Sequence, residues 1–258
     1  MPSLTKWYLD VVTDDGAALI VYAASLGWGA LHVEFASTLL ARPGAPPIEE
    51  TAWSGVELPE HSSVGVRFRH DGLGVAGHWR GLAAPIEATL LDDEMGLLSW
   101  ECILPVAAVD VRFPGGALTG RGYVERLTMT RVPWSLPLRT LRWGRFISPT
   151  HGVVWIDWQG GPPRRWLWLD GVLQPSAGVR DTGLTGLDGD RELRLVGGRE
   201  LCDRRSLQVL SKHLPALDTL PLGPLRDLRE TKRLSRGSLR RAGAVEDDGW
   251  AIHEIVSW

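Results

Sequence analysis

Strict alternation of apolar and polar side chains, interrupted at short intervals by turn residues, constrains this chain of 258 residues more than any other feature. A period of two is typical of a β-strand with one face on a core, and no convincing long amphipathic helix appears. Asp-Gly and Asp-Asp pairs, as in residues 14–16, 71–72 and 92–93, are typical of the tight turns between such strands. The alternating segments are residues 6–12, 18–26, 30–37, 64–70 and 74–81, and then 120–130, 151–160, 164–171, 191–198, 206–213 and 249–258.

This pattern predicts an all-β protein of sequential antiparallel strands, either one up-and-down barrel or two partly open barrels packed together. A Pro-Gly-Gly run at residues 114–116 separates two strand-rich halves. We therefore expect an N-terminal β domain over residues 1–118 and a C-terminal β domain over residues 119–258. Residues 224–233 could form a short helix.

Charge and hydropathy exclude several classes of partner. The formal net charge is −3 and the isoelectric point is near 6.2, so the chain has no general attraction to nucleic acid or to an anionic membrane surface. The first residues lack the pattern of a secretion signal, and no run of 18 apolar residues occurs. We expect a cytoplasmic protein with no integral membrane segment and no nucleic-acid partner.

Common cofactor and metal motifs are also missing. The chain has no GxGxxG, GxxxxGK[ST], HExxH or GxSxG sequence, and its seven histidines are scattered without the spacing of metal ligands. Cys102 and Cys202 stand alone in the sequence, without a CxxC spacing. The sequence predicts neither a metal site nor a cofactor.

One acidic side chain lies in an unusual context. In the stretch GRGYVERLTMT, alternation places Tyr123, Glu125, Leu127 and Met129 on one face of a strand. A carboxyl group among aromatic and apolar neighbours can serve as an acid, because burial raises its pKa and keeps it protonated near neutral pH. Glu125 is therefore our first candidate for a catalytic residue, with Tyr123 beside it, although it could equally be one end of a salt bridge.

Two further candidates lie in the second half. Asp157 shares a face with Trp155 in VVWIDWQ, and His253 lies in the aromatic closing segment AIHEIVSW. Thirteen tryptophans, against three tyrosines and four phenylalanines, suggest an aromatic interior or a cavity wall. The tryptophans that we name as candidate substrate-binding residues are Trp7, Trp79, Trp143, Trp155 and Trp168.

Several of these stretches together resemble a known family. They are WYLDVVTDDGAALIVYAASL, GRGYVE, LRWGRF with VVWIDW, and AIHE. The chain is similar in them to the lipocalin-like, calycin-related family of carotenoid 1,2-hydratases (hydroxyneurosporene synthases), a group that also includes lipocalin-like cyclases. The resemblance spans most of the chain and implies lipocalin-like β domains and an apolar small-molecule substrate such as a polyene, a terpenoid or a polyketide.

The match to the hydratases is partial at the motif that matters most. Their comparable stretch reads roughly Gly-Tyr-His-Asp-His-Asn-Trp-Gly, so Tyr123 matches the tyrosine, Val124 replaces the histidine and Glu125 replaces the aspartate. The Trp-Gly pair has its nearest counterpart at Trp143-Gly144. The resemblance therefore carries over the scaffold better than the reaction.

Three functions remain open from the sequence. The first is acid-assisted addition of water to a C=C bond, or a related isomerisation, with Glu125 as acid and tryptophan faces stabilising the developing cation. The second is a cyclase that folds a linear polyene for an intramolecular [4+2] ring closure. The third is a carrier that binds an apolar ligand without changing it.

Overall fold

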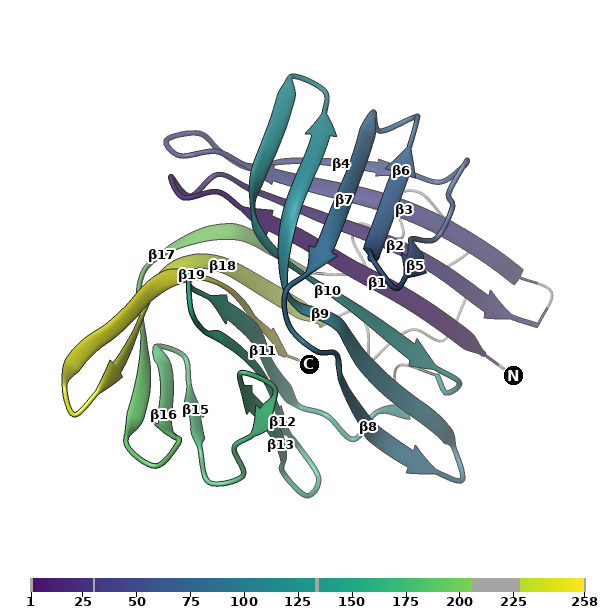
Figure 1. Ribbon diagram of the computed structural model, residues 1–258. Helices are drawn as coiled ribbons and strands as arrows, with labels where there is room; N and C mark the ends of the chain where they lie inside the picture. Colours follow the sequence, from purple (N-terminus) through teal and green to yellow (C-terminus); the bar gives the residue numbers. More distant parts are fainter. Residues whose placement is uncertain (1, 30, 133–134, 206–227, 258) are drawn as a thin grey trace. The chain divides into compact units, whose positions relative to one another are not determined.

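The computed structural model describes residues 2–29, 31–132, 135–205 and 228–257. In these ranges it contains nineteen strands and no helix, and every strand pairing is antiparallel (Figure 1). The prediction of an all-β antiparallel protein is confirmed. The strands form two sheets, and the chain divides into two compact units, Met1–Val132 and Pro133–Trp258.

The first unit contains a ten-stranded sheet whose path runs β4-β3-β2-β1-β10-β9-β7-β6-β5, with β8 pairing to β9 beside this path. The N-terminal strand therefore lies in the middle of the sheet, against a strand from the end of the same unit. The bounds are β1 Ser3–Val12, β2 Ala18–Trp28, β3 Leu31–Ala41, β4 Ile48–Ala52, β5 Glu60–Ser62, β6 Gly65–His70, β7 Val75–Gly81, β8 Ile86–Asp93, β9 Gly96–Phe113 and β10 Gly116–Met129.

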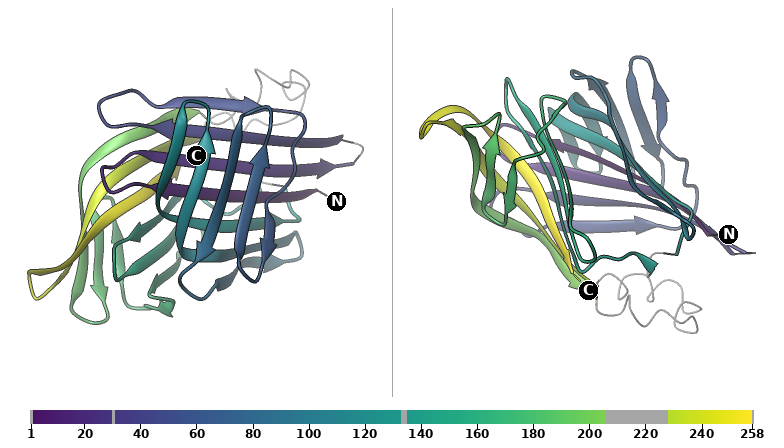
Figure 2. Two further views of the ribbon diagram at one scale, coloured as in Figure 1. Left: turned by 45° about the horizontal axis from the view of Figure 1, so that its top comes forward. Right: turned by 90° about the horizontal axis from the view of Figure 1, so that it is seen from below.

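This sheet curls so that β6 and β7 cross one face of the purple strands β1 to β3 (Figure 2). The crossing strands enclose a core formed by alternate residues of each strand. Trp7, Leu9 and Val11 enter this core from β1, and Phe68 and Trp79 enter it from β6 and β7. Burial of this apolar cluster is the main favourable term in folding the unit.

The boundary between the units differs from the sequence-based division after residue 118. That division falls inside β10, which pairs with β1 and β9 of the first sheet, and the structural division follows Val132. The Pro-Gly-Gly run is the turn of the long β9–β10 hairpin. Because this turn resembles a linker in composition, the pattern alone misplaced the boundary.

The second unit contains a nine-stranded sheet in the order β14-β13-β12-β11-β19-β18-β17-β16-β15. Its first strand again pairs with a strand from its end, β11 with β19. The bounds are β11 Thr140–Ile147, β12 Gly152–Gln159, β13 Arg164–Leu169, β14 Val172–Leu173, β15 Gly178–Arg180, β16 Gly183–Leu187, β17 Arg191–Arg205, β18 Arg229–Arg241 and β19 Ala244–Ser257.

The second sheet has its own core, to which Phe146, Trp155 and Leu193 belong. Gly144 allows the Trp155 ring to lie against β11, because a Cβ atom there would come within 2.2 Å of the ring. The proposed short helix at residues 224–233 is wrong for its described part, where Arg229–Arg241 forms a strand. The predicted strand at residues 206–213 lies outside the described residues.

Candidate functional site

All three tyrosines of the chain gather on one face of the first sheet. Tyr8 lies directly opposite Tyr22 on β2, and its ring packs edge-on against Tyr22 and Tyr123, with centroid distances of 5.3 and 6.0 Å. This face of β1 is the one opposite to Trp7 and Leu9, which enter the core. Tyr8 and Tyr123 are nevertheless buried.

Two carboxylates accompany these phenols in a repeated pattern. The Tyr8 hydroxyl donates to Oδ2 of Asp10 at 2.9 Å, and the Tyr123 hydroxyl donates to Oε2 of Glu125 at 2.7 Å. Each tyrosine thus holds the acid two residues further along its own strand. In the antiparallel register of β1 and β10, Tyr8 lies opposite Glu125 and Asp10 lies opposite Tyr123. The Tyr8–Asp10 pair and the Tyr123–Glu125 pair are therefore adjacent and run in opposite directions.

Glu125 receives a second donor from β9. The indole Nε1 of Trp100 donates to Glu125 Oε2 at 2.6 Å, so one carboxyl oxygen accepts both a phenol and an indole. Donors on Oε2 stabilise the anion, and a proton on this carboxyl group belongs on Oε1. We refer to Tyr8, Asp10, Trp100, Tyr123 and Glu125 as the tyrosine–acid cluster.

Burial shifts the pKa values of two other ionisable groups on this face, Tyr123 and Cys102. It raises the pKa of Tyr123 well above the ordinary value of 10.0, and the nearby charge of Glu125 acts in the same direction. Burial likewise raises the pKa of the Cys102 thiol, which lies opposite Glu125 and hydrogen-bonds with Tyr123. Both groups are therefore neutral at physiological pH and act as hydrogen-bonding groups, not as anions.

Irregular pairing between β9 and β10 occurs at this cluster. The register shifts on both sides of Val124, so that Val124 faces Leu104, Gly122 faces Ala107 and Glu125 faces Cys102. The extra residues of β9 at these shifts include Pro105, which has no N–H to donate to a regular ladder. Such bulges bend a strand and redirect its side chains, and they occur often beside active sites.

Asp157 is in the second unit, in a different electrostatic setting. It is 2% exposed, its Oδ1 lies 2.9 Å from Nε of Arg165, and its Oδ2 lies 3.6 Å from an Arg142 nitrogen. Gln159 donates to it as well. The two guanidinium groups make Asp157 the centre of an ion-pair cluster that joins β11, β12 and β13.

His253 is also in the second unit and is 8% exposed. Its Nε2 lies 2.9 Å from the Ser235 hydroxyl. Burial lowers its pKa to about 4, and the positive charge of Arg233 adds to this effect. The imidazole is therefore neutral at pH 7. The structure brings Tyr123 and Glu125 together in one unit, and it positions Asp157 and His253 on one sheet of the other.

The candidate tryptophans are all buried, but in different settings. Trp7 and Trp79 belong to the core of the first unit, on the face of the sheet away from Glu125. Trp155 belongs to the core of the second unit, while Trp143 and Trp168 are buried on β11 and β13. Trp79 still supports the tyrosine–acid cluster, because its Nε1 donates to the backbone carbonyl of Asp10 at 2.7 Å.

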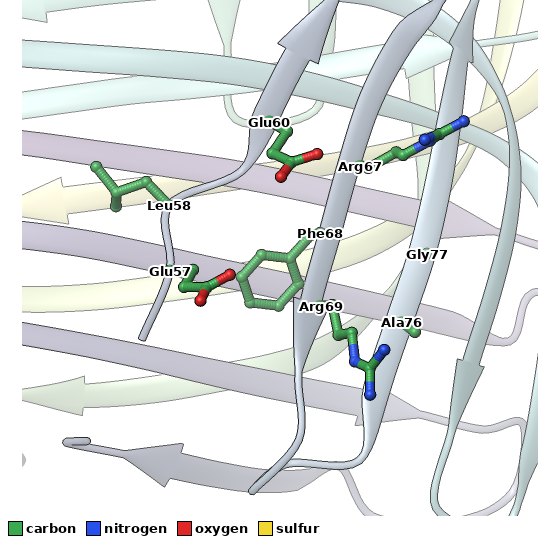
Figure 3. A pocket seen from close by; sticks show the side chains of 8 residues that line it. All are labelled: Glu57, Leu58, Glu60, Arg67, Phe68, Arg69, Ala76 and Gly77. Carbon is green, nitrogen blue, oxygen red and sulfur yellow. The ribbon is translucent and has the colours of Figure 1, made fainter. Parts of the chain in front are cut away.

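A separate pocket of about 320 Å³ opens on the first unit around β6. Figure 3 shows Arg67 and Arg69 reaching from β6, with Glu57 and Glu60 on the other side of the Phe68 ring. Both arginines and both glutamates are exposed, and Arg69 pairs with Asp71. This pocket has the character of an ordinary charged surface, and its lining residues do not include those of the tyrosine–acid cluster.

Sequence reasoning missed Tyr8, Asp10 and Trp100. A usable signal existed for the first two, because YLD at residues 8–10 repeats the Tyr-x-acid spacing of YVE at residues 123–125. Trp100 gave no comparable signal, since its contact with Glu125 depends on the pairing of β9 with β10.

Two features are absent from the described part of the chain. No helix there is long and apolar enough to cross a membrane. In the same residues, no group of three or more His, Cys, Asp or Glu side chains is arranged to hold a metal ion.

Comparison with known proteins identifies the fold. No family model and no curated protein matches the chain. Among solved structures, a candidate AttH protein from Nitrosomonas europaea aligns over 98% of this chain and 91% of its own, with a TM-score of 0.58 and 9% identity. Kievitone hydratase from Nectria haematococca aligns over 98% and 88%, with a TM-score of 0.57 and 12% identity.

CghA solved with Sch210972 has a TM-score of 0.61 and 13% identity, over 99% of this chain and 88% of its own. At such low identities the three structures establish a shared architecture across nearly the whole chain. The chain thus has the lipocalin-like fold expected from the sequence, in two halves.

Proposed function

We propose that this protein is a hydratase that adds water to a C=C bond of an apolar polyene or terpenoid-like small molecule. The observation that carries the proposal is the setting of Glu125, whose Oε2 accepts hydrogen bonds from Tyr123 and Trp100 on a buried aromatic face. A carboxyl group held in this way has a defined orientation, which general acid catalysis requires.

The chemistry follows from the positions of the donors. When Glu125 is protonated on Oε1, it gives this proton to one alkene carbon and leaves a carbocation on the other. The two donors on Oε2 stabilise the carboxylate that forms, so they make the acid stronger. Nearby aromatic faces stabilise the cation until water adds. The added water then loses one proton, and the net change is the addition of H₂O.

The comparisons support this reaction class. One solved structure with the same fold is named a kievitone hydratase, and another was solved with the compound Sch210972. These names describe those proteins. They make kievitone and Sch210972 reasonable first probes for this one.

The test is to incubate the protein with kievitone and with a panel of terpenoid and polyketide polyenes, and to follow product mass. A hydratase yields a mass gain of one water. Glu125→Gln keeps the volume and the hydrogen bonds but cannot donate the proton, so turnover should fall by roughly 10²-fold or more while ligand binding persists.

Glu101→Gln is the matched control. Glu101 is also an acid of this sheet, but it pairs with Arg126 and points to the opposite face from Glu125. Its replacement should leave turnover unchanged. A product that is an isomer of unchanged mass would indicate a cyclase and not a hydratase. Recovery of every ligand unaltered would indicate a carrier. Full turnover by Glu125→Gln would remove Glu125 as the acid.

A further inference from the structure

A second carboxylate lies beside Glu125, and the proposed reaction has not used it. Asp10 is 0% exposed, and Tyr8 donates to its Oδ2. The backbone carbonyl of the same residue accepts a hydrogen bond from Trp79, so both the side chain and the main chain of Asp10 are fixed. A fully buried aspartate costs considerable free energy, which makes a functional role worth testing.

The register determines how Asp10 and Glu125 relate. Asp10 faces Tyr123 and Tyr8 faces Glu125, so the two acids occupy diagonal positions on one face of an antiparallel pair. Residues at diagonal positions lie about 7–8 Å apart, which is within reach of long side chains on that face. The side chains of Asp10 and Glu125 are therefore neighbours, and each already accepts a hydrogen bond from a tyrosine of the same face.

A third ionisable group lies on the same face. Cys102 is opposite Glu125 on β9 and hydrogen-bonds with Tyr123; burial raises the pKa of its thiol, and the negative charges of Glu125 and Asp10 act in the same direction. Two neighbouring carboxylates repel each other when both are ionised, which favours a state in which one of them retains a proton. The pair then contains one acid and one base at the same pH.

We propose that Asp10, oriented by Tyr8, is the partner carboxylate of Glu125, and that the two share one proton. The catalytic roles rest on the proposed function: Glu125 gives its proton to the alkene, and Asp10 takes a proton from the water that adds. After one turnover Asp10 is protonated and Glu125 is ionised. Proton exchange with solvent restores the starting state, so protons and charge balance over the cycle.

Other ionisable groups on this face also affect the pair. They are Lys6 from β1, whose Nζ lies 4.7 Å from the centre of the Tyr22 ring, Tyr22 itself from β2, Tyr123 from β10 and Cys102 from β9. Lys6 favours ionised carboxylates, whereas the neutral phenols and the thiol only donate or accept hydrogen bonds. A test must therefore isolate the effect of Asp10.

Trp100 provides a readout that needs no substrate. Because its indole donates to Glu125 Oε2, ionisation of Glu125 should change the fluorescence of this tryptophan. The pH titration of intrinsic fluorescence, minus that of Trp100→Phe, isolates this signal. In the wild-type protein we expect two steps, as in any strongly coupled pair. In Asp10→Asn we expect one step, with the upper midpoint lowered by roughly one pH unit or more.

Tyr8→Phe is the second variant, in case Asp10→Asn does not fold. It keeps the ring contacts and the Asp10 carboxylate but removes the donor that stabilises the Asp10 anion. The shared proton then moves towards Asp10, and the step reported by Trp100 should again shift to lower pH. Asp110→Asn, at an exposed aspartate of β9 paired with Arg80, is the control and should leave the titration unchanged.

The two proposals fail in different ways. If the upper midpoint stays in place in both Asp10→Asn and Tyr8→Phe, the shared proton is disproved, whatever the protein does to polyenes. If the midpoint shifts but no polyene gains water, the carboxylate pair stands and the hydratase is wrong. With an active substrate, Asp10→Asn should lower turnover by roughly 10²-fold and remove one limb of the pH–rate profile.

Discussion

An ionisable side chain within a sheet takes its chemical character from the groups that surround it. Glu125 is held by a phenol and an indole, which orient a carboxyl group without adding a formal charge. Asp157 forms ion pairs with two arginines, and these pairs join three strands. Both are acids among aromatic residues in the sequence, and only the partners separate a candidate catalyst from a candidate structural ion pair.

His253 supplies a prediction about stability at this scale. Its pKa is about 4 in the folded protein, against an ordinary value of 6.5, because the ring is buried. Between these two values the unfolded chain binds more protons than the folded one, so stability falls as the pH falls from 6.5 towards 4. The full loss from this residue is roughly 3 kcal/mol.

Replacing His253 with Gln keeps a polar partner for Ser235 but removes the titration. The free energy of unfolding, measured by denaturant at several values between pH 4 and 7, should therefore fall less steeply in His253→Gln than in the wild type. Parallel curves for the two proteins would show that His253 titrates normally in the folded state.

At the scale of elements, the meeting of β1 with β10 determines the candidate site. Gly122 permits this close approach, because a Cβ atom there would lie 1.9 Å from the backbone oxygen of Asp10 and 2.7 Å from Val109. The backbone of β1 would have to move away, which would also disturb the hydrogen bond from Trp79 to Asp10.

Gly122→Ala should accordingly lower the free energy of unfolding by about 1–3 kcal/mol, as in other overpacked sites. Gly27→Ala is the matched control, since the Cβ there meets only the Ser3 hydroxyl, which can rotate away. It should change stability by no more than about 0.5 kcal/mol. Urea denaturation of both variants tests the difference, and equal midpoints would contradict it.

The same elements show what sequence reasoning could and could not predict. Alternation identified β1 and most of β10, and it correctly grouped Tyr123 with Glu125, because one-strand geometry depends only on a period of two. It could not pair β1 with β10, since strands distant in sequence pair through packing that no local pattern encodes. The long strand β9 was not predicted from the sequence, because Pro105 interrupts its pattern. A proline at a β-bulge has the same sequence signature as a proline in a loop.

At the scale of the whole molecule, each unit has its own sheet and its own apolar core, and the tryptophans are distributed over both. Most of those we selected from the sequence are packing residues of these cores or are buried in the sheets. Trp100 differs, because its indole N–H is committed to Glu125 within the tyrosine–acid cluster. Tryptophan fluorescence can therefore report where a ligand binds as well as whether it binds.

An apolar ligand such as kievitone should quench the fluorescence of the protein saturably if it binds on the face of the tyrosine–acid cluster. Quenching weakens steeply with distance, so Trp100→Phe should remove a larger share of the quenching amplitude than any remote tryptophan. Trp53→Phe is the control, because Trp53 follows β4, which β3, β2 and β1 separate from β10 in the same sheet, and its ring packs against Phe35 with a centroid distance of 5.4 Å. Equal losses of amplitude in the two variants would place the ligand elsewhere, whereas a selective loss in Trp100→Phe would locate it beside Glu125.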